Sequence, residues 1–212
     1  MGKTIRKEKD LTKEEKKRLD KFDKVCEELE SKGYERHDFL ISVEKANTTG
    51  FLVPLPFVLI YILLYFLLGN KFVFDDIADH LLLFFILALA SLFIHEGLHG
   101  ITHALFARNH FKDIDFGVII KKLTPYCTCC SYEKKYQYIL AAGMPFLILG
   151  VVFGIITLFL NSTLLFFLTT INFMGTSGDL LVILLVLRNK SKKKNVLYYD
   201  HPTDVGVVMF DK

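Results

Sequence analysis

Residues 81–106 read LLLFFILALASLFIHEGLHGITHALF, an apolar run with His95, Glu96 and His99 inside it. The run is longer than the roughly 18–20 residues that a helix needs to cross a lipid bilayer. Ionisable side chains inside such a helix are costly, and they usually mark a functional site. This stretch therefore predicts a membrane-spanning helix that carries a functional site.

The string His95-Glu96-Gly97-Leu98-His99 places two imidazoles one helical turn apart, on one face of this helix. Two such imidazoles can bind a single zinc ion, and the glutamate beside them can accept a proton from an attacking water. In a soluble helix the string would indicate an ordinary metalloprotease. In a membrane helix it indicates hydrolysis inside the bilayer.

The composition of the chain agrees with an integral membrane protein that has a polar N-terminal segment. The 212 residues are 52% hydrophobic and 23% charged, and residues 1–50 hold 13 of 26 Lys and Arg and 12 of 23 Asp and Glu. A net charge of +3 is too small to indicate nucleic-acid binding. The charged N-terminus does not resemble a signal peptide, and the four cysteines do not form the pattern of a disulfide framework.

Four apolar segments are long enough to span a membrane, at about 51–68, 81–106, 139–160 and 164–187. The fold predicted is therefore an all-α membrane protein with four transmembrane helices. We expect three parts: a segment of residues 1–50 with an amphipathic helix, a four-span domain of residues 51–187, and a tail of residues 188–212.

The charges that flank the spans predict that both termini are cytoplasmic. Residues 69–80 carry one lysine against three aspartates, whereas the next loop and the tail are rich in basic residues. Lys and Arg gather on the cytoplasmic side of membrane proteins. The basic residues are Arg108, Lys112, Lys121, Lys122, Lys134 and Lys135 in the loop, and Arg188, Lys190, Lys192, Lys193 and Lys194 in the tail.

A catalytic zinc usually has three protein ligands, so the two histidines need a third partner. Asp179 precedes Arg188 by nine residues, as His99 precedes Arg108, so both groups lie about 13 Å from the same boundary. His103 lies on the same helical face as the two histidines, but about 12 Å along the axis from His95, which is too far for one ion. We therefore prefer Asp179, with His103 as the alternative ligand or as a supporting residue.

His110 and the cysteines are weaker candidates for the third ligand, because they belong to the loop after the second span and would have to fold back. Cys127, Cys129 and Cys130 could bind a metal, carry a lipid or sense the redox state. Three cysteines without a companion cluster do not select one of these roles.

The segment from Phe93 to Gly100, followed by Gly178-Asp179 in the last span, resembles the bacterial membrane proteins known as putative zincin peptidases. The likeness extends over most of the chain. It includes Lys45-Ala46-Asn47, Phe116-Gly117-Val118, Thr124-Pro125-Tyr126-Cys127, Met144-Pro145 and Asp200-His201-Pro202. The resemblance implies zinc hydrolase chemistry and names no substrate.

More distantly, the arrangement resembles the site-2 proteases, which cleave their substrates within the membrane. In those enzymes the third zinc ligand is an aspartate from a later span, usually in a Leu-Asp-Gly setting. The sequence here is Gly178-Asp179-Leu180, so the likeness at Asp179 rests on its place in the last span rather than on the local motif.

Outside the spans, local patterns predict smaller elements. Thr12 to Glu15 form a capping box, so we expect a helix that runs to about Ser31 and stops near Gly33. Alternation over residues 114–120, with a second strand at about 126–132, predicts a β-hairpin between the second and third spans. The hairpin could offer its edge to an extended peptide. In the tail, residues 198–204 predict a turn before a strand at 205–210, with Asp200 and His201 in the turn.

Together these features predict a zinc-dependent membrane-embedded metallopeptidase that cleaves a peptide or membrane-protein substrate near the cytoplasmic face. His95, His99 and Asp179 would bind Zn²⁺, and Glu96 would be the general base. The alternative is a non-catalytic membrane scaffold or regulatory protein that zinc stabilises, and a closed site with four protein ligands would favour it. A metal transporter is disfavoured because the spans show no inverted repeat and no chain of polar residues.

Overall fold

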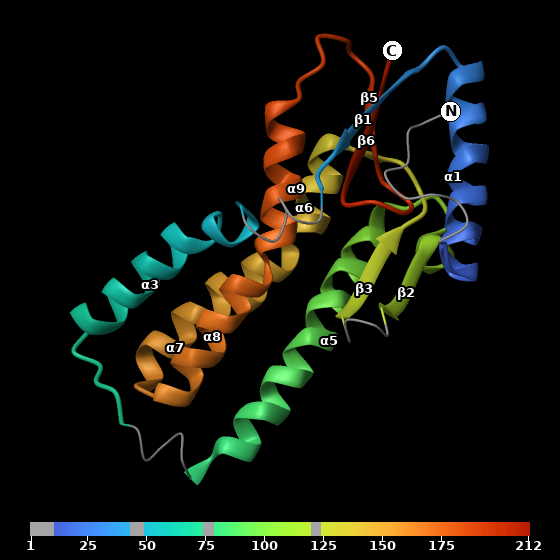
Figure 1. The fold of residues 1–212 in the computed structure, drawn as a ribbon. Coiled ribbons are helices and arrows are strands. Elements are labelled where there is room, and N and C mark those ends of the chain that lie inside the picture. The colour runs from blue at the N-terminus through green and yellow to red at the C-terminus, as the bar shows by residue number, and fades with distance from the viewer. Residues whose placement is uncertain (1–10, 43–48, 74–78, 120–123) are drawn as a thin grey trace.

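The computed structural model of the chain describes residues 11–42, 49–73, 79–119 and 124–212. Several residues of the sequence argument lie outside these ranges, namely Lys45-Ala46-Asn47, Asp75, Asp76, Lys121 and Lys122. Within the described ranges the chain is mostly helical, with two small sheets (Figure 1).

Four helical stretches are long and apolar enough to cross a membrane, at Gly50–Leu67, Leu81–Phe106, Lys135–Leu160 and Thr163–Arg188. They agree with the four predicted spans to within a few residues and indicate an integral membrane protein. The first comprises a short 3-10 helix η2 (Gly50–Leu52) and α3 (Leu55–Leu67). The second is one uninterrupted helix, α5 (Leu81–Phe106).

The third and fourth spans are each irregular in the middle, which the sequence argument did not anticipate. The third consists of α6 (Lys135–Pro145), a π-helical stretch η4 (Phe146–Val152) and α7 (Phe153–Leu160). Pro145 has no backbone N–H to donate, so regular helix cannot continue there undisturbed. The fourth is divided at Thr176 into α8 (Thr163–Gly175) and α9 (Ser177–Arg188).

Aromatic packing and interhelical hydrogen bonds hold the spans together. Tyr61 of α3 contacts Phe166 and Phe173 of α8 in one buried cluster. Its hydroxyl is 2.8 Å from Thr157 Oγ1, which in turn is 3.2 Å from Thr169 Oγ1. Without water in the hydrocarbon core, such hydroxyl contacts between helices satisfy polar groups that would otherwise be costly.

The N-terminal helix α1 (Lys13–Ser31) begins with the predicted capping box: Thr12 Oγ1 accepts the Glu15 N–H, and the Glu15 carboxylate accepts the Thr12 N–H. The helix ends before Gly33, whose φ of 82° needs a residue without a Cβ. Its apolar stripe is buried at Phe22, Cys26 and Leu29.

That stripe packs on a four-stranded antiparallel sheet that the all-α prediction missed. The sheet has the order β1-β6-β5-β4, from β1 (Glu35–Leu40), β6 (Gly206–Asp211), β5 (Val196–Asp200) and β4 (Glu133–Lys134). Helix α1 covers one face of this sheet. On the other face, Tyr198, Val207 and Met209 pack with residues of α6 and α9. The tail prediction was therefore wrong at residues 198–200, which are strand rather than turn, and right about the strand that follows.

A separate pair of strands, β2 (Ile114–Ile119) and β3 (Thr124–Cys129), lies beside α5 (Figure 1). Between α5 and β2 come the 3-10 helix η3 (His110–Asp113) and a short turn. The pair approaches α5 closely because Gly100 has no side chain: a Cβ at this position would lie 2.1 Å from Phe116 Cζ.

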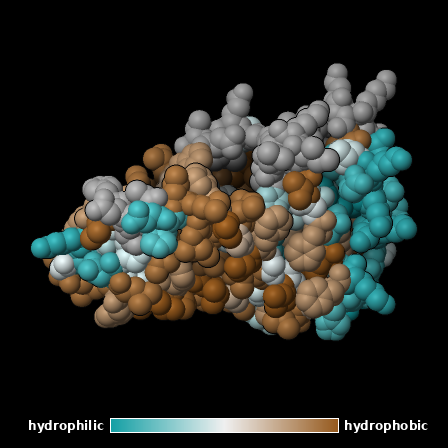
Figure 2. Space-filling view, turned by 90° about the horizontal axis from the view of Figure 1, so that it is seen from below, coloured by the Kyte–Doolittle hydropathy of each residue, from teal (hydrophilic) through white to brown (hydrophobic). Residues whose placement is uncertain are grey.

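Large apolar side chains cover the outside of the spanning helices (Figure 2). They form a broad brown surface, the larger group of hydrophilic residues lies at the end where α1 lies, and a smaller group lies at the opposite end. Exposed apolar area of this extent is unfavourable in water and is expected for helices that face lipid. Helix α1 and the C-terminal strand β6 lie at the same end of the helical layer, as an even number of spans between them requires (Figure 1).

Candidate metal centre

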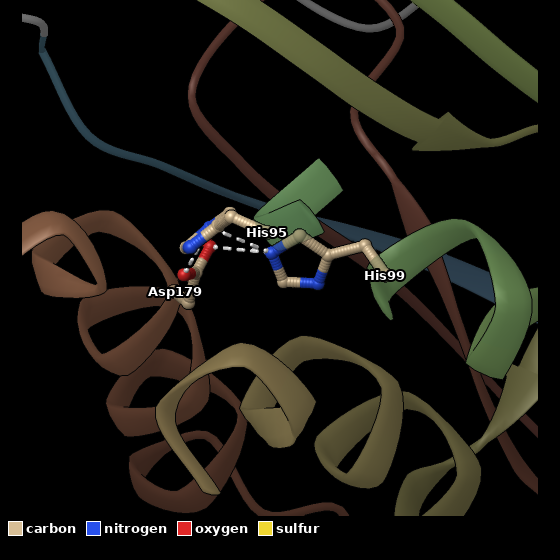
Figure 3. A group of neighbouring side chains, drawn as sticks. All are labelled: His95, His99 and Asp179. Carbon is tan, nitrogen blue, oxygen red and sulfur yellow. Dashed lines mark hydrogen bonds and ion pairs between the residues drawn. The ribbon is translucent and has the colours of Figure 1, made fainter. Parts of the chain in front are cut away.

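The structure brings His95 and His99 of α5 together with Asp179 of α9 (Figure 3). The two histidines are four residues apart in one uninterrupted helix, so their rings lie on the same face, with their planes at 75° to each other. Their Nε2 atoms are 3.2 Å apart. Asp179 approaches from the fourth span, with Oδ2 3.2 Å from His95 Nε2 and Oδ1 3.2 Å from His99 Nε2.

The break at Thr176 explains how Asp179 reaches this position. The Thr176 hydroxyl donates to the carbonyl of Phe173, and α9 begins at the next residue. Asp179 therefore lies in the first turn of α9, where the helix dipole favours a negative charge. A continuous helix would give the carboxylate neither that dipole nor this direction.

The Nε2 atom of each histidine lies from the other, and from one oxygen of Asp179, at the spacing of two ligands of a tetrahedral metal ion. At a metal–ligand distance of about 2.05 Å, two donor atoms 3.2 Å apart subtend about 100° at the metal, close to the tetrahedral angle. Asp179 Oδ2 is buried, and its 3.2 Å approach to His95 Nε2 does not have the geometry of a hydrogen bond. A buried carboxylate oxygen in that state is costly, and a cation would satisfy it.

A second contact fixes the orientation of the His99 ring. His99 Nδ1 lies 2.9 Å from the carbonyl oxygen of Ala141 on α6. A carbonyl oxygen can only accept, so Nδ1 donates a proton to it, and Nε2 is the ring atom directed at the centre. Hydrogen bonds of this kind hold metal-binding histidines in the correct tautomer.

Glu96, the next residue on α5, is half-buried and lies beside the edge of β3. The backbone N–H of Cys130 donates to the carbonyl of Asp113, so alternate residues of β3 direct their N–H groups away from β2. The Cys127 N–H is one of these, and it faces the Glu96 carboxylate. The strand pair thus places a backbone donor next to the proposed base.

The centre is largely buried but not fully closed. The side chains of His95, His99 and Asp179 are 15%, 9% and 22% exposed. A fully closed site would exclude a substrate, so this partial exposure is compatible with binding one.

His103, the alternative ligand, lies elsewhere. Its Nδ1 is 3.0 Å from both carboxylate oxygens of Glu133, in a group completed by Cys129. Burial raises the pKa of Glu133 above its usual range, and the contact with His103 partly offsets this. Burial also raises the pKa of the Cys129 thiol.

The remaining candidates make structural contacts. His110 Nδ1 lies 2.9 Å from the carbonyl of Ala104. Asp200 accepts hydrogen bonds from the Cys129 N–H and the Tyr138 hydroxyl. His201 Nδ1 accepts the N–H groups of Thr203 and Asp204, which makes a local turn.

Sequence reasoning missed two contributors to the centre, the carbonyl of Ala141 and the break at Thr176. Neither is signalled by residue type, since any residue offers a carbonyl and threonine also occurs within continuous helices. The missed Glu133 did carry a signal, because it is an acid immediately before the third span.

A sequence model of the family described as "Putative zincin peptidase" matches residues 88–194. This range includes the two histidines and Glu96 on α5 and also Asp179 on α9. Searches of curated proteins and of solved structures gave no match. Since the family match covers half of the sequence and every residue of the centre, the chain belongs to the putative zincin peptidase family.

Proposed function

We propose that the protein is a zinc-dependent peptidase embedded in the membrane, with His95, His99 and Asp179 as the zinc ligands and Glu96 as the general base. The observation that carries the proposal is the composition of the centre. Three donors converge, and among the described residues no fourth His, Cys, Asp or Glu joins their group. Catalytic zinc sites keep such an open position, whereas structural sites usually have four protein ligands.

Zinc bound there would polarise the peptide carbonyl and make water a stronger nucleophile. The protein supplies the proton transfers. Glu96 accepts a proton from the water as its oxygen attacks the carbonyl carbon, and then delivers this proton to the amine as the C–N bond breaks. The Cys127 N–H beside the carboxylate limits the directions in which Glu96 can turn.

The substrate we propose is an extended peptide, including a segment of a membrane protein. The edge of β3 that faces away from β2 passes next to Glu96. Its Cys127 and Cys129 N–H groups already contact Glu96 and Asp200, so we propose that an extended chain would pair with the carbonyl groups of this edge. Hydrolysis requires an exposed amide, and a helical substrate hides its amides in hydrogen bonds until it is unwound.

We place the reaction near the cytoplasmic face of the membrane, with both termini in the cytoplasm. The support is the excess of Lys and Arg in the loop before the third span and in the tail. On this proposal α1 and the four-stranded sheet form a cytoplasmic layer. The expected division into residues 1–50, 51–187 and 188–212 is retained, with β1 and β6 joining the first and last parts in one sheet.

The rival function is a non-catalytic scaffold that zinc stabilises. It needs neither a base nor an open ligand position. The placement of Glu96 next to the donors, together with their partial exposure, favours hydrolysis.

The test is Glu96→Gln in full-length protein reconstituted in liposomes and incubated with a library of quenched-fluorescence peptides. We expect the variant to keep its zinc and to lose about 10²–10⁴-fold in cleavage rate, because the amide cannot accept the proton. Glu14→Gln, on the exposed side of α1, is the matched control and should cleave like the parent chain. Cleavage by Glu96→Gln at the parent rate, or none by the zinc-loaded parent chain, would refute the proposal.

A further inference from the structure

A second group of buried donor atoms lies one helical turn beyond the first. His103 Nδ1, Cys129 Sγ and a carboxylate oxygen of Glu133 all lie within 4.8 Å of one another. The three residues come from α5, β3 and β4, and they are 4%, 1% and 1% exposed. We propose that they form a second zinc site, one that joins the helix of the first site to the strands beside it.

The donor set is the one that zinc accepts. Imidazole nitrogen, thiolate sulfur and carboxylate oxygen are its three common protein ligands, whereas magnesium and calcium bind oxygen and avoid sulfur. His103 Nδ1 lies 3.0 Å from Glu133 Oε1, and Cys129 Sγ lies 3.9 Å from the same oxygen. At ordinary zinc–ligand distances these separations correspond to angles of about 90° and 125°, so small movements complete a distorted tetrahedron.

The contact with His103 does not satisfy both oxygens of the buried Glu133 carboxylate. Both carboxylate oxygens lie 3.0 Å from the same nitrogen, which can donate only one proton to the two of them. The neighbouring Cys129 thiol reaches one oxygen only at 3.9 Å. A divalent cation would compensate the charge of the glutamate and would also allow the cysteine to bind as thiolate.

The backbone that carries the donors is held in place without any metal. The Cys129 N–H donates to Asp200 Oδ2 at 2.9 Å, and the Arg108 N–H donates to Ser131 Oγ at 3.3 Å. Glu133 belongs to β4, which pairs with β5 at Tyr198. Because the surrounding sheet fixes these positions, the donors meet without a large loss of conformational freedom, as a metal site requires.

The second group shares no residue with the first, although the two are neighbours on α5. The ring centroids of His99 and His103 are 6.5 Å apart. An ion held by His103 would fix the last turns of α5 against β3, the strand whose Cys127 N–H faces Glu96. The inference concerns metal binding alone, so it can succeed or fail independently of the proposed peptidase activity.

The absorption spectrum of bound Co²⁺ distinguishes the two sites, because only the second group contains a cysteine, Cys129. Full-length protein purified in detergent is stripped of metal and titrated with Co²⁺. We expect two equivalents to bind, one of them with a thiolate-to-cobalt charge-transfer band in the near ultraviolet. Cys129→Ser and His103→Ala should each abolish the band and remove one equivalent, and His95→Ala should leave the band intact.

Cys127→Ser is the matched control, because it removes another thiol from the same strand and should keep the band. The decisive measurement is made on the parent chain, so a variant that fails to fold cannot rescue the proposal. Absence of a thiolate band in the cobalt-loaded parent chain would overturn it. So would a band that survives in folded Cys129→Ser, since another cysteine would then be the ligand.

Discussion

Replacement of Asp179 by asparagine tests whether the fourth span supplies a metal ligand. The two side chains have nearly the same shape, so the packing of α9 against α6 should change little. The substitution removes the negative charge and exchanges one oxygen for a nitrogen that carries two hydrogens. Of the two carboxylate oxygens that lie 3.2 Å from His95 and His99, one becomes an NH2 group, which cannot bind a metal, and the other becomes an uncharged amide oxygen.

The expected loss follows from how zinc affinity is distributed over its ligands. Zinc sites with four protein ligands bind zinc with a free energy of about 10–16 kcal/mol, which is about 2.5–4 kcal/mol per ligand. Loss of one charged ligand should therefore weaken zinc binding by about 10²–10³-fold, since 1.4 kcal/mol corresponds to a factor of ten. Asp179→Ala should lose at least as much, because it removes the donor altogether.

The assay is competition for zinc between the purified chain and a chromophoric chelator at fixed pH. Asp20→Asn, on the exposed side of α1, controls for the change in net charge and should bind like the parent chain. If Asp179→Asn binds zinc as tightly as the parent chain at the histidine site, Asp179 is not a ligand. His103 or an additional residue would then have to be reconsidered.

Three further substitutions or measurements test the framework around the centre. Arg18 donates to Asp115, to the Tyr126 hydroxyl and to a backbone carbonyl, so Arg18→Ala should lower the free energy of unfolding by about 2–4 kcal/mol in a denaturant titration. Burial raises the pKa of Cys26 from 9.0 to about 11. About one thiol in 10⁴ is then ionised at pH 7, and its alkylation, followed by mass spectrometry, should rise tenfold per pH unit until near pH 11. Gly100→Ala should displace the Phe116 ring and destabilise the protein, and the double variant with Phe116→Ala should recover part of that loss in the same titration.

The spans were predictable because the relevant signal is local and strong. Leu81–Phe106 is mostly apolar, and its length and composition together indicate a membrane helix. The helix at Lys13–Ser31 was equally predictable, since Thr12 and Glu15 specify its start by direct contact. In both cases the residues that determine the structure are neighbours in the sequence.

The four-stranded sheet was not predictable in this way. β1 reads Glu-Arg-His-Asp-Phe-Leu, with four polar residues in a row and no alternation to mark a strand. It is extended because it pairs with β6, about 170 residues later in the chain, where Glu35 faces Asp211. β4 has only two residues and owes its conformation to β5. Pairing between distant segments leaves no pattern in either segment alone.

At the centre, the helical spacing of the histidines explains both the part that was predictable and the part that was not. His95, His99 and His103 lie on one face of α5, and each step of four residues advances about 6 Å along the axis. One ion can therefore take two neighbours but not all three, so one histidine must find another partner. This limit favours Asp179 over His103 as the third ligand of the first site. The residues that His103 contacts instead are distant in the sequence and leave no local pattern around it. The structure places Glu133 and Cys129 against it. The same helical rise that restricts the first site to two histidines thus leaves His103 to a second set of donors, from strands that follow α5 in the chain.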